Sequence, residues 1–501
     1  MQPRTPTENR NMAELTDQQV DEIARRLMQR LSPAAASAGG SAPAPAPAAR
    51  AAGGPSAAPV APGVFTDLDA AVKAAAQAFA ALDAMSLAIR DKIIASIRES
   101  MLTHAEALAR EAQAETGMGR WEDKLVKNRV VARKTPGTEA LVPEARSGDD
   151  GLMLMERAPF GVIGSITPCT NPTSTIICNT IGMVAAGNAV VFCVHPTAKT
   201  VSIHNVALLN EAILRAGGPP NLVCTITEPS IAAAQAVMKH PGIRLLVVTG
   251  GEGVVHAAMQ SGKRAICAGP GNPPVVVDET ADIALAARGV VRGGSFDNNV
   301  ICVDEKETFV VESVANELLA AMKQNGAVVL DAAQSRQMEN VIFKERHGPW
   351  AAGVVNKELI GKNAGMILGL IGVSAGDDVR LAVMDVQASH PLVWTEQMMP
   401  VMPVVRVANV DEAIDRALAT EGKRRHTAVM YSRNIEKLSR MARLCNCSIF
   451  VKNGPAYAGL GAGGEGHSSF TIASPTGEGL TGPRSFSRER RCVVVDQFRI
   501  I

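Results

Sequence analysis

Residues 161–196 read GVIGSITPCTNPTSTIICNTIGMVAAGNAVVFCVHP, and this stretch decides the fold class. Two short, continuously apolar runs, 161–166 and 189–194, flank a stretch at 173–186 with the length and composition of a helix. An apolar strand followed by a helix and a second apolar strand is the repeating unit of a parallel sheet covered on both faces. The stretch therefore predicts a βαβ unit.

The same alternation continues towards the C-terminus. Further apolar runs are 222–226, 245–248 and 264–267, and the helical stretches between the runs are 199–216, 231–240 and 253–261. This pattern predicts an α/β fold with a doubly wound, nucleotide-binding sheet, whose ligands gather at the carboxyl ends of the strands. Upstream, residues 66–119 have helical periodicity, with Gly117 as a stop signal.

A second α/β region follows from residue 274 to about 464. Its strand-like runs are 275–278, 308–311, 327–330, 401–407, 427–431 and 448–451. A chain of 501 residues is too long for one core of ordinary size, so two or more domains are expected.

Composition excludes several classes of protein. The formal net charge is +1 with 20% charged residues, so no basic face for nucleic acid is expected. No apolar run reaches the roughly 18 residues of a membrane span. The nine cysteines are odd in number and scattered, which indicates free thiols in a reducing compartment, and their spacing predicts no metal site.

Residues 1–31 carry one amphipathic helix. Thr16 and Gln19 can form a capping box, and apolar residues at 20, 23, 24, 27, 28 and 31 form a single stripe. Residues 32–63 are rich in Ala, Pro, Gly and Ser and predict a disordered linker. A helix on such a tether is suited to docking on a partner. A helix bound at a membrane surface and a transit peptide are the alternatives.

The strongest candidate nucleophile is Cys302, in the stretch 295–306, SFDNNVICVDEK. This polar loop follows two glycines and lies between a helix-like segment and a β-rich one at 307–312. In such a loop a thiol can be exposed, and neighbouring groups can shift its pKa. Buried packing is the usual role of a free Cys, so the neighbouring motifs must decide.

Four other stretches carry a family resemblance: TPCTNP at 167–172, VTGGEG at 248–253, CAGPGN at 267–272 and TEQMMPV at 395–401. In order and spacing, residues 64–501 resemble the aldehyde dehydrogenase superfamily. Within it the chain is most similar to the CoA-acylating propionaldehyde and acetaldehyde dehydrogenases of bacterial microcompartments, of the propanediol- and ethanolamine-utilisation type.

The resemblance implies a domain organisation. A Rossmann-like domain at 64–273 would bind NAD or CoA, and an α/β catalytic domain would span 274–465. Segments near 140–158 and at 466–501 would form a small oligomerisation sheet, so a homo-oligomer, dimer or tetramer, is expected. The N-terminal helix resembles an encapsulation peptide, which implies docking to shell or cargo proteins through residues 16–31 and a location in the microcompartment lumen within the cytoplasm.

The resemblance also implies the site residues. Cys302 would be the nucleophile, and the Asn171 side-chain amide would bind the oxyanion together with the Cys302 backbone N–H. The cofactor would contact Thr167, Pro168, His195, Pro196, Thr249, Gly250, Gly251 and Glu396. Many relatives carry Lys where His195 stands, and this departure leaves NAD versus NADP open.

The most informative departure is Cys267. Hydrolytic aldehyde dehydrogenases resemble this segment but have a Glu there, as the base that activates water. Without that base the thioester should persist until the thiol of CoA removes the acyl group. The expected reaction is propionaldehyde, CoA and NAD to propionyl-CoA and NADH. Acetaldehyde as substrate, a hydrolytic enzyme and a non-catalytic cargo protein are the alternatives.

Overall fold

The computed structural model describes residues 59–500. The predicted helix at 16–31, the docking role assigned to it and most of the predicted linker lie outside these residues. Residues 59–63, the last five of the predicted linker, belong to a turn in which Val60 N donates to Val64 O at 2.7 Å. The packed chain thus begins a few residues earlier than we predicted.

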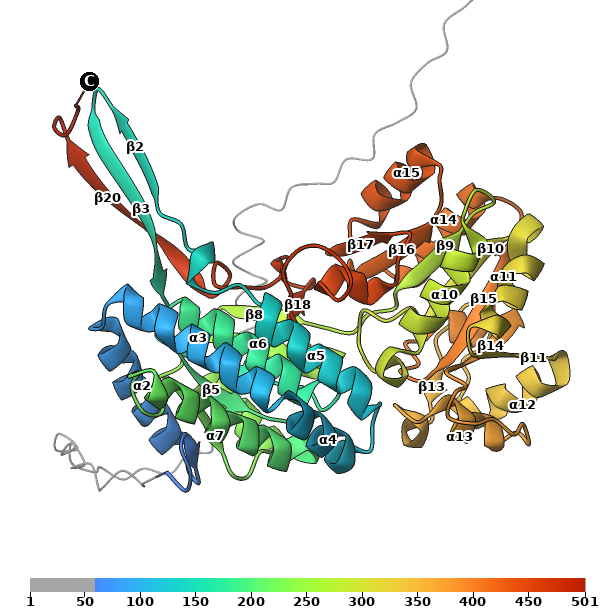
Figure 1. Cartoon of the computed structure of the whole chain (residues 1–501), viewed down its shortest axis with the longest axis horizontal. Coiled ribbons are helices and arrows are strands. Elements are labelled where there is room, and N and C mark those ends of the chain that lie inside the picture. Colours follow the sequence, from blue (N-terminus) through green and yellow to red (C-terminus); the bar gives the residue numbers. More distant parts are fainter. Residues whose placement is uncertain (1–58, 501) are drawn as a thin grey trace, which may run out of the picture. The chain divides into compact units, whose positions relative to one another are not determined.

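The first sheet has six parallel strands in the order β1-β6-β5-β4-β7-β8 (Figure 1). They are β1 (Val64–Phe65), β4 (Val162–Ile166), β5 (Ala189–Cys193), β6 (Val223–Ile226), β7 (Leu245–Thr249) and β8 (Ala265–Ala268). All five apolar runs predicted between residues 161 and 267 are strands of this sheet. The doubly wound α/β prediction is therefore confirmed for this part of the chain.

Helices lie on both faces of this sheet. They are α2 (Leu68–Asp83), α3 (Leu87–Thr103), α4 (Ala105–Thr116), α5 (Trp121–Lys134), α6 (Pro172–Ala185), α7 (Lys199–Arg215), α8 (Ile231–Lys239) and α9 (Glu252–Met259). Gly117 ends α4 with φ of 63°, as its predicted stop signal requires. Every residue of α6 is buried, because α3, α5 and α7 pack over it. The sequence reading did not identify α5.

The second sheet has seven parallel strands in the order β11-β14-β15-β10-β9-β16-β17. They are β9 (Pro274–Val277), β10 (Glu307–Val311), β11 (Ala327–Leu330), β14 (Leu381–Val386), β15 (Val401–Val407), β16 (Thr427–Tyr431) and β17 (Ile449–Lys452). Its helices are α10 (Ile283–Gly294), α11 (Glu312–Gln324), α12 (Ala332–Ile342), α13 (Ala364–Gly369), α14 (Val410–Glu421) and α15 (Ile435–Cys445). The six predicted strands are present, and β14 is additional.

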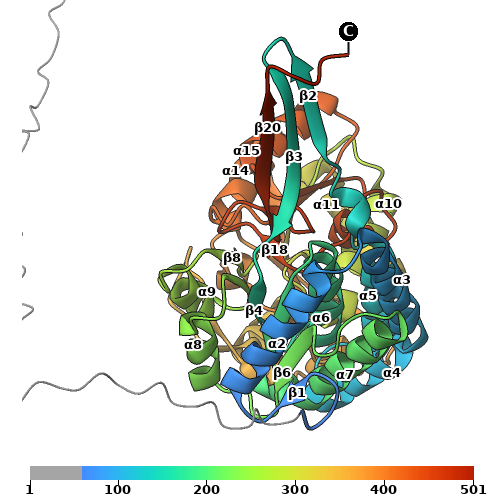
Figure 2. The same ribbon diagram turned by 90° about the vertical axis from the view of Figure 1, so that its left-hand side faces the viewer.

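A third, antiparallel sheet joins distant parts of the sequence. It consists of β2 (Glu144–Gly148), β3 (Gly151–Pro159) and β20 (Ser487–Val495), with β3 in the middle. The predicted pairing of the C-terminal tail with residues 152–157 is confirmed, since Cys492 lies opposite Leu154. Figures 1 and 2 show the three strands extending away from the helices around the first sheet.

Two short antiparallel pairs complete the strands, β12 (Phe343–Glu345) with β13 (Val354–Val355) and β18 (Ile472–Ala473) with β19 (Gly479–Leu480). From residue 59 to residue 500, the structure contains no helix that is both long enough and apolar enough to cross a membrane.

Candidate active site

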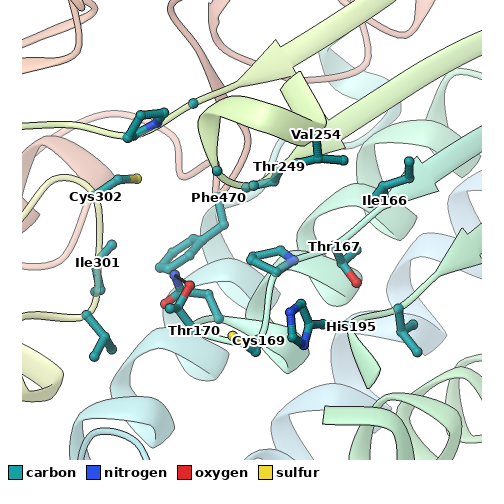
Figure 3. A pocket seen from close by; sticks show the side chains of 18 of the residues that line it. Ile166, Thr167, Cys169, Thr170, His195, Thr249, Val254, Ile301, Cys302 and Phe470 are labelled. Atoms are coloured by element: carbon teal, nitrogen blue, oxygen red, sulfur yellow. Dashed lines mark hydrogen bonds between the residues drawn. The ribbon is translucent and has the colours of Figure 1, made fainter. Parts of the chain in front are cut away.

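A cavity of about 620 Å³ lies between the strand ends of the first sheet and the loop that carries Cys302. Figure 3 shows Cys302 and Ile301 on one side, Thr167, Thr249 and His195 on the other, and Phe470 between them. All ten residues that the sequence assigned to a site line this cavity: Thr167, Pro168, Asn171, His195, Pro196, Thr249, Gly250, Gly251, Cys302 and Glu396.

The parallel sheet explains why these residues meet. Thr167 directly follows β4, His195 follows β5 and Gly250 follows β7, so all three lie at the carboxyl edge of neighbouring strands. The Thr167 hydroxyl is buried and has no hydrogen-bond partner within the described chain. A buried, unpaired hydroxyl on a cavity wall is a group that a ligand can satisfy.

His195 is a neutral contact on this wall. Its Nδ1 accepts from the Thr197 backbone N–H at 3.2 Å, and burial lowers the pKa of the ring. An uncharged imidazole gives a 2′-phosphate little electrostatic attraction.

The turn after β7 leaves backbone groups open. Gly251 precedes the first residue of α9 and is exposed, and nothing lies within 4 Å of where its Cβ would be. The Thr249 hydroxyl pairs with the Thr471 hydroxyl at 3.0 Å. The start of α9 therefore offers backbone N–H groups to an anion, although Glu252 adds a negative charge beside them.

Cys302 follows a tight left-handed turn. Asp297, Asn298 and Asn299 have φ of 46°, 55° and 66°, values that Asn and Asp tolerate better than most residues. The chain then comes so close to Gly271 that a Cβ there would lie 2.4 Å from the Cys302 carbonyl oxygen. The backbone around the nucleophile is thus fixed on two sides.

The Cys302 thiol is only partly exposed, and its pKa is raised to about 12, chiefly by burial and then by the charge of Glu396. The sequence indicated a loop in which the thiol can be exposed. In the structure the neutral thiol is favoured at neutral pH, so the proton must be removed for attack.

Buried charges support the loop on its far side. Lys306 is fully buried, and its Nζ donates to Asn299 Oδ1 at 2.6 Å, Asn299 O at 2.9 Å and Ile301 O at 3.1 Å. The Ile301 N–H donates to Asp304 Oδ2 at 3.1 Å. These contacts hold the residues directly before Cys302.

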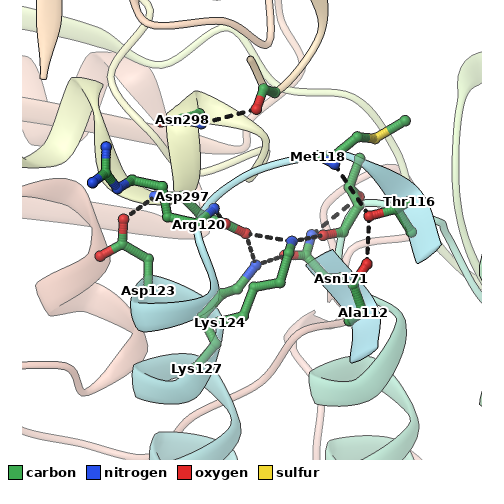
Figure 4. A network of polar contacts seen from close by, with 12 residues as sticks. Ala112, Thr116, Met118, Arg120, Asp123, Lys124, Lys127, Asn171, Asp297 and Asn298 are labelled. Atoms are coloured by element: carbon green, nitrogen blue, oxygen red, sulfur yellow. Dashed lines mark hydrogen bonds and ion pairs between the residues drawn. The ribbon is translucent and has the colours of Figure 1, made fainter. Parts of the chain in front are cut away.

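Asn171 lies at the start of α6 and is 7% exposed. Its side chain makes no capping hydrogen bond to the helix. Instead Oδ1 accepts from Lys127 Nζ at 2.6 Å, and Nδ2 donates to the Thr170 hydroxyl at 3.1 Å (Figure 4). The second N–H of the amide remains available to a ligand in the cavity.

A cysteine and a carboxamide thus line one cavity between two parallel sheets. The sequence pattern of the aldehyde dehydrogenase family matches residues 52–480. The chain belongs to the aldehyde dehydrogenase family.

Similar proteins place the chain within this family. The acetylating acetaldehyde dehydrogenase EutE of Salmonella typhimurium is 53% identical over 442 residues, which are 88% of this chain and 94% of that protein. The structure of Rhodopseudomonas palustris propionaldehyde dehydrogenase, with bound CoA and an acylated cysteine, has a TM-score of 0.84 and 49% identity, covering 87% of this chain and 98% of that one. A propionaldehyde dehydrogenase from the fucose utilisation bacterial microcompartment of Clostridium phytofermentans gives a TM-score of 0.85 and 46% identity, covering 88% and 100%.

In this aldehyde dehydrogenase Glu396 is held at one end. Its Oε1 accepts from the Gly271 N–H at 3.0 Å, and burial is the main reason that its pKa is raised. Glu396 also lines the cavity, and no hydrogen bond to its other carboxylate oxygen is found among the described residues.

Cys267, by contrast, does not line the cavity. It is fully buried in β8, and its backbone N–H donates to Thr476 Oγ1 at 3.0 Å. Burial is the main reason that its pKa is raised to about 11. The side chain at this position therefore supplies no base for water.

Sequence reasoning missed His426. It is buried, its Nε2 has no hydrogen-bond partner in the described chain, and burial is the main cause that lowers its pKa to about 3. A Cβ on Gly271 would lie 3.2 Å from its ring, so the imidazole packs close to the Cys302 loop. In the sequence His426 is a single His in the basic run 423–426, KRRH, and nothing in this run indicates that it is buried near Cys302.

Sequence reasoning also missed Lys127 and Asp297. Charged residues on an amphipathic helix and in a loop are usually solvated, and nothing in their spacing indicated burial. Among residues 59–500 no group of His, Cys, Asp and Glu side chains could hold a metal ion.

Proposed function

We propose that this protein is a CoA-acylating aldehyde dehydrogenase that converts a short-chain aldehyde, CoA and NAD to an acyl-CoA and NADH. One observation carries the proposal: Cys302 and Asn171 line one cavity, while the position of the hydrolytic base is a buried Cys267 outside it. The cavity has a nucleophile and an oxyanion donor but no base at that position. A thiol is therefore the better acceptor of the acyl group.

Chemistry begins at Cys302. The thiol gives its proton to solvent water, Sγ bonds to the aldehyde carbon, and the carbonyl electron pair moves to oxygen. The free N–H of Asn171 and the backbone N–H of Cys302 donate to this oxyanion, and two such donors stabilise it by several kcal/mol. Bound NAD supplies the acceptor for the hydride that leaves the same carbon. Cys302 then holds the acyl group as a thioester.

CoA completes the reaction. Its thiolate attacks the thioester carbon, the bond to Sγ breaks, and Cys302 leaves as a thiolate. One thioester replaces another, so little free energy is lost and the reaction can run in reverse. Hydrolysis would need an activated water, and Cys267 cannot supply one.

The groups on the cavity wall fit a nucleotide. The unpaired Thr167 hydroxyl, with Pro168 beside it, and the open N–H group at Gly251 suit the ribose and phosphates. Glu396 would bind the nicotinamide ribose, and the neutral His195 with Pro196 would lie against the adenosine ribose. The absence of a cation at His195 favours NAD over NADP.

On this proposal the chain has two working domains. Residues 64–273 bind NAD and CoA, and residues 274–465 carry the nucleophile. The sheet of β2, β3 and β20 would join subunits, because β20 is an edge strand with an unpaired side and exposes Val493, Val494 and Val495. Covering that edge with another subunit gives a homo-oligomer.

We further propose that the enzyme works inside a bacterial microcompartment. The similarity to a propionaldehyde dehydrogenase of such a compartment supports this location. Residues 16–31 would dock to shell or cargo proteins, and residues 32–58 would tether them. Deleting residues 1–31 should abolish co-purification with shells and leave the turnover number unchanged; retained co-purification would contradict the docking role.

The reaction is tested by NADH absorbance with propionaldehyde and NAD, with and without CoA. Turnover should require CoA, and Cys302→Ala should lower it by at least about 10⁴-fold because the covalent step is lost. Sustained turnover without CoA, with free acid as the product, would contradict the acylating mechanism.

The substrate is tested by comparing kcat/KM for propionaldehyde and acetaldehyde. We expect propionaldehyde to be preferred. The two differ by one methylene, for which a hydrophobic pocket discriminates by roughly 10- to 200-fold. A preference for acetaldehyde would make acetyl-CoA the product.

A further inference from the structure

We infer that Lys127 is a positioning residue for the oxyanion amide: it fixes the orientation of Asn171 and polarises its N–H group. This inference rests on the proposed function, in which Asn171 donates to the oxyanion. The carrying observation is the hydrogen bond of 2.6 Å from Lys127 Nζ to Asn171 Oδ1, deep inside the protein.

The contact determines which end of the amide faces the substrate. An amide can turn over and exchange its oxygen with its nitrogen at little cost when nothing distinguishes the two. An ammonium group has only donors, so it can contact the oxygen and not the nitrogen. Lys127 is 3% exposed, and water cannot replace it. Nδ2 is thereby directed away from Lys127, with one N–H on Thr170 and the other free.

The charge of Lys127 also strengthens the donor. A cation on the amide oxygen draws electrons from the nitrogen, and hydrogen bonds in a chain polarise one another. Burial is the main cause that lowers the pKa of Lys127, to about 8, while the charge of Asp297 opposes this shift. At neutral pH Lys127 is therefore mostly a cation.

Asp297 connects the amide to the nucleophile. Its Oδ2 pairs with Lys127 Nζ and with Lys124 Nζ, the latter at 2.9 Å, and both lysines come from α5 (Figure 4). Its Oδ1 accepts from the Arg120 N–H at 2.7 Å. Asp297 is in the turn of residues 296–299 that leads into Cys302. One buried cluster thus holds both the oxyanion donor and the loop of the nucleophile.

Lys124 provides a matched control. It lies three positions before Lys127 on the same helix, is 1% exposed and pairs with the same carboxylate oxygen. It makes no hydrogen bond to Asn171; its other hydrogen bond is to the Thr170 carbonyl at 3.4 Å. Replacing either lysine by Met removes one buried partner of Asp297, and only the Lys127 change also releases the amide.

The experiment measures CoA-dependent NADH formation and thermal unfolding for Lys127→Met and Lys124→Met. Both variants should unfold at similarly lowered temperatures. Lys127→Met should lower kcat by about 10- to 100-fold, since misplacing an oxyanion donor costs about that much. The KM for the aldehyde should change little, and Lys124→Met, which keeps the contact of Lys127 with the amide, should lower kcat clearly less than Lys127→Met does.

A double-mutant cycle with Asn171→Ala separates positioning from a structural role. If Lys127 acts through the amide, Lys127→Met should cause no further loss of kcat in the Asn171→Ala protein. Alkylation of Cys302 by iodoacetamide should proceed at the same rate in all variants, which shows that the nucleophile is intact.

Two results would overturn the inference: an equal kcat loss in Lys124→Met, or an undiminished effect of Lys127→Met in the Asn171→Ala protein. Failure of the proposed function is a different result, because it would appear as absent CoA-dependent turnover in the wild type.

Discussion

The two sides of the cavity are built in opposite ways. On the nucleophile side Asp297, Asp304, Glu305, Lys306 and Glu307 are all fully buried, and each makes at least one hydrogen bond to another residue of the protein. On the strand-end side Gly251 and Glu252 are exposed, and the Thr167 hydroxyl has no partner in the described chain.

The difference indicates which groups each side needs from its ligands. The backbone of the Cys302 loop is held by hydrogen bonds from Lys306 and to Asp304, so its geometry exists before substrate binds. The strand-end side has hydrogen-bond donors that gain a partner only when a ligand is present. Substitutions on the first side should therefore change stability, and those on the second should change cofactor binding.

The largest effect is expected for Lys306→Met. Three acceptors around Asn299 and Ile301 would lose their buried donor, and the nearby acids would lose a countercharge. We expect the free energy of unfolding to fall by about 3–5 kcal/mol, as measured in urea. Lys323→Met, at an exposed position of α11, is the control and should change it by less than about 0.5 kcal/mol. Equal effects would contradict the view of Lys306 as a buried support.

The protonation of Cys302 gives the next effect. Because its pKa is raised to about 12, the thiolate fraction should increase tenfold with each pH unit below that value. The rate of alkylation by iodoacetamide in the ligand-free protein should thus rise about 100-fold from pH 7 to pH 9. Subtracting the rate of Cys302→Ala removes the contribution of other thiols. A rate that levels off below pH 8 would mean that the thiolate already exists at neutral pH.

On the strand-end side, His195→Lys should change cofactor preference. A cation at this position can pair with a 2′-phosphate, so kcat/KM for NADP relative to NAD should rise about tenfold. His204→Lys, on the exposed side of α7 and outside the cavity, should leave the ratio unchanged. An unchanged ratio in His195→Lys would place the adenosine ribose elsewhere.

The smallest effect is expected for Gly251→Ala. The backbone has φ of −67° and open space around the new Cβ, so stability should change by less than about 1 kcal/mol. The methyl group would obstruct a phosphate at the start of α9, and the KM for NAD should rise a few-fold. Gly253→Ala is the control, because Gly253 is the second residue of α9 and does not line the cavity. Equal KM values in both variants would contradict a phosphate contact at Gly251.

The sequence predicted the parts of the structure that rest on a repeated pattern. Continuously apolar runs predicted eleven of the strands in the two large sheets. A parallel strand that is buried on both faces has apolar residues at nearly every position, so it can be recognised in the sequence. β14 was missed because LAVMDV follows a Gly- and Asp-rich loop and contains a charged residue, Asp385. α5 was missed because its buried face contains Lys124, Lys127 and Asn128.

The same limit applies to the site. The ten predicted residues were found through motifs, and each motif lies at a strand end or in a tight turn. Lys127 bonds to Asn171 and to Asp297, which are 44 and 170 positions away, and the His426 ring packs close to Gly271. A short sequence pattern cannot predict a contact between residues so far apart in the chain, so these contacts are visible only in the folded structure.

The sheet of β2, β3 and β20 has a consequence for the order of events during synthesis. Arg157 of β3 and Glu489 of β20 are paired although 332 positions separate them. On the ribosome, β3 emerges long before its partner strand is made, and this edge of β3 stays unpaired until residues 487–495 have been added. If subunits join through this sheet, assembly must wait until β20 has been made, and a protein truncated before residue 487 would be excluded from the oligomer.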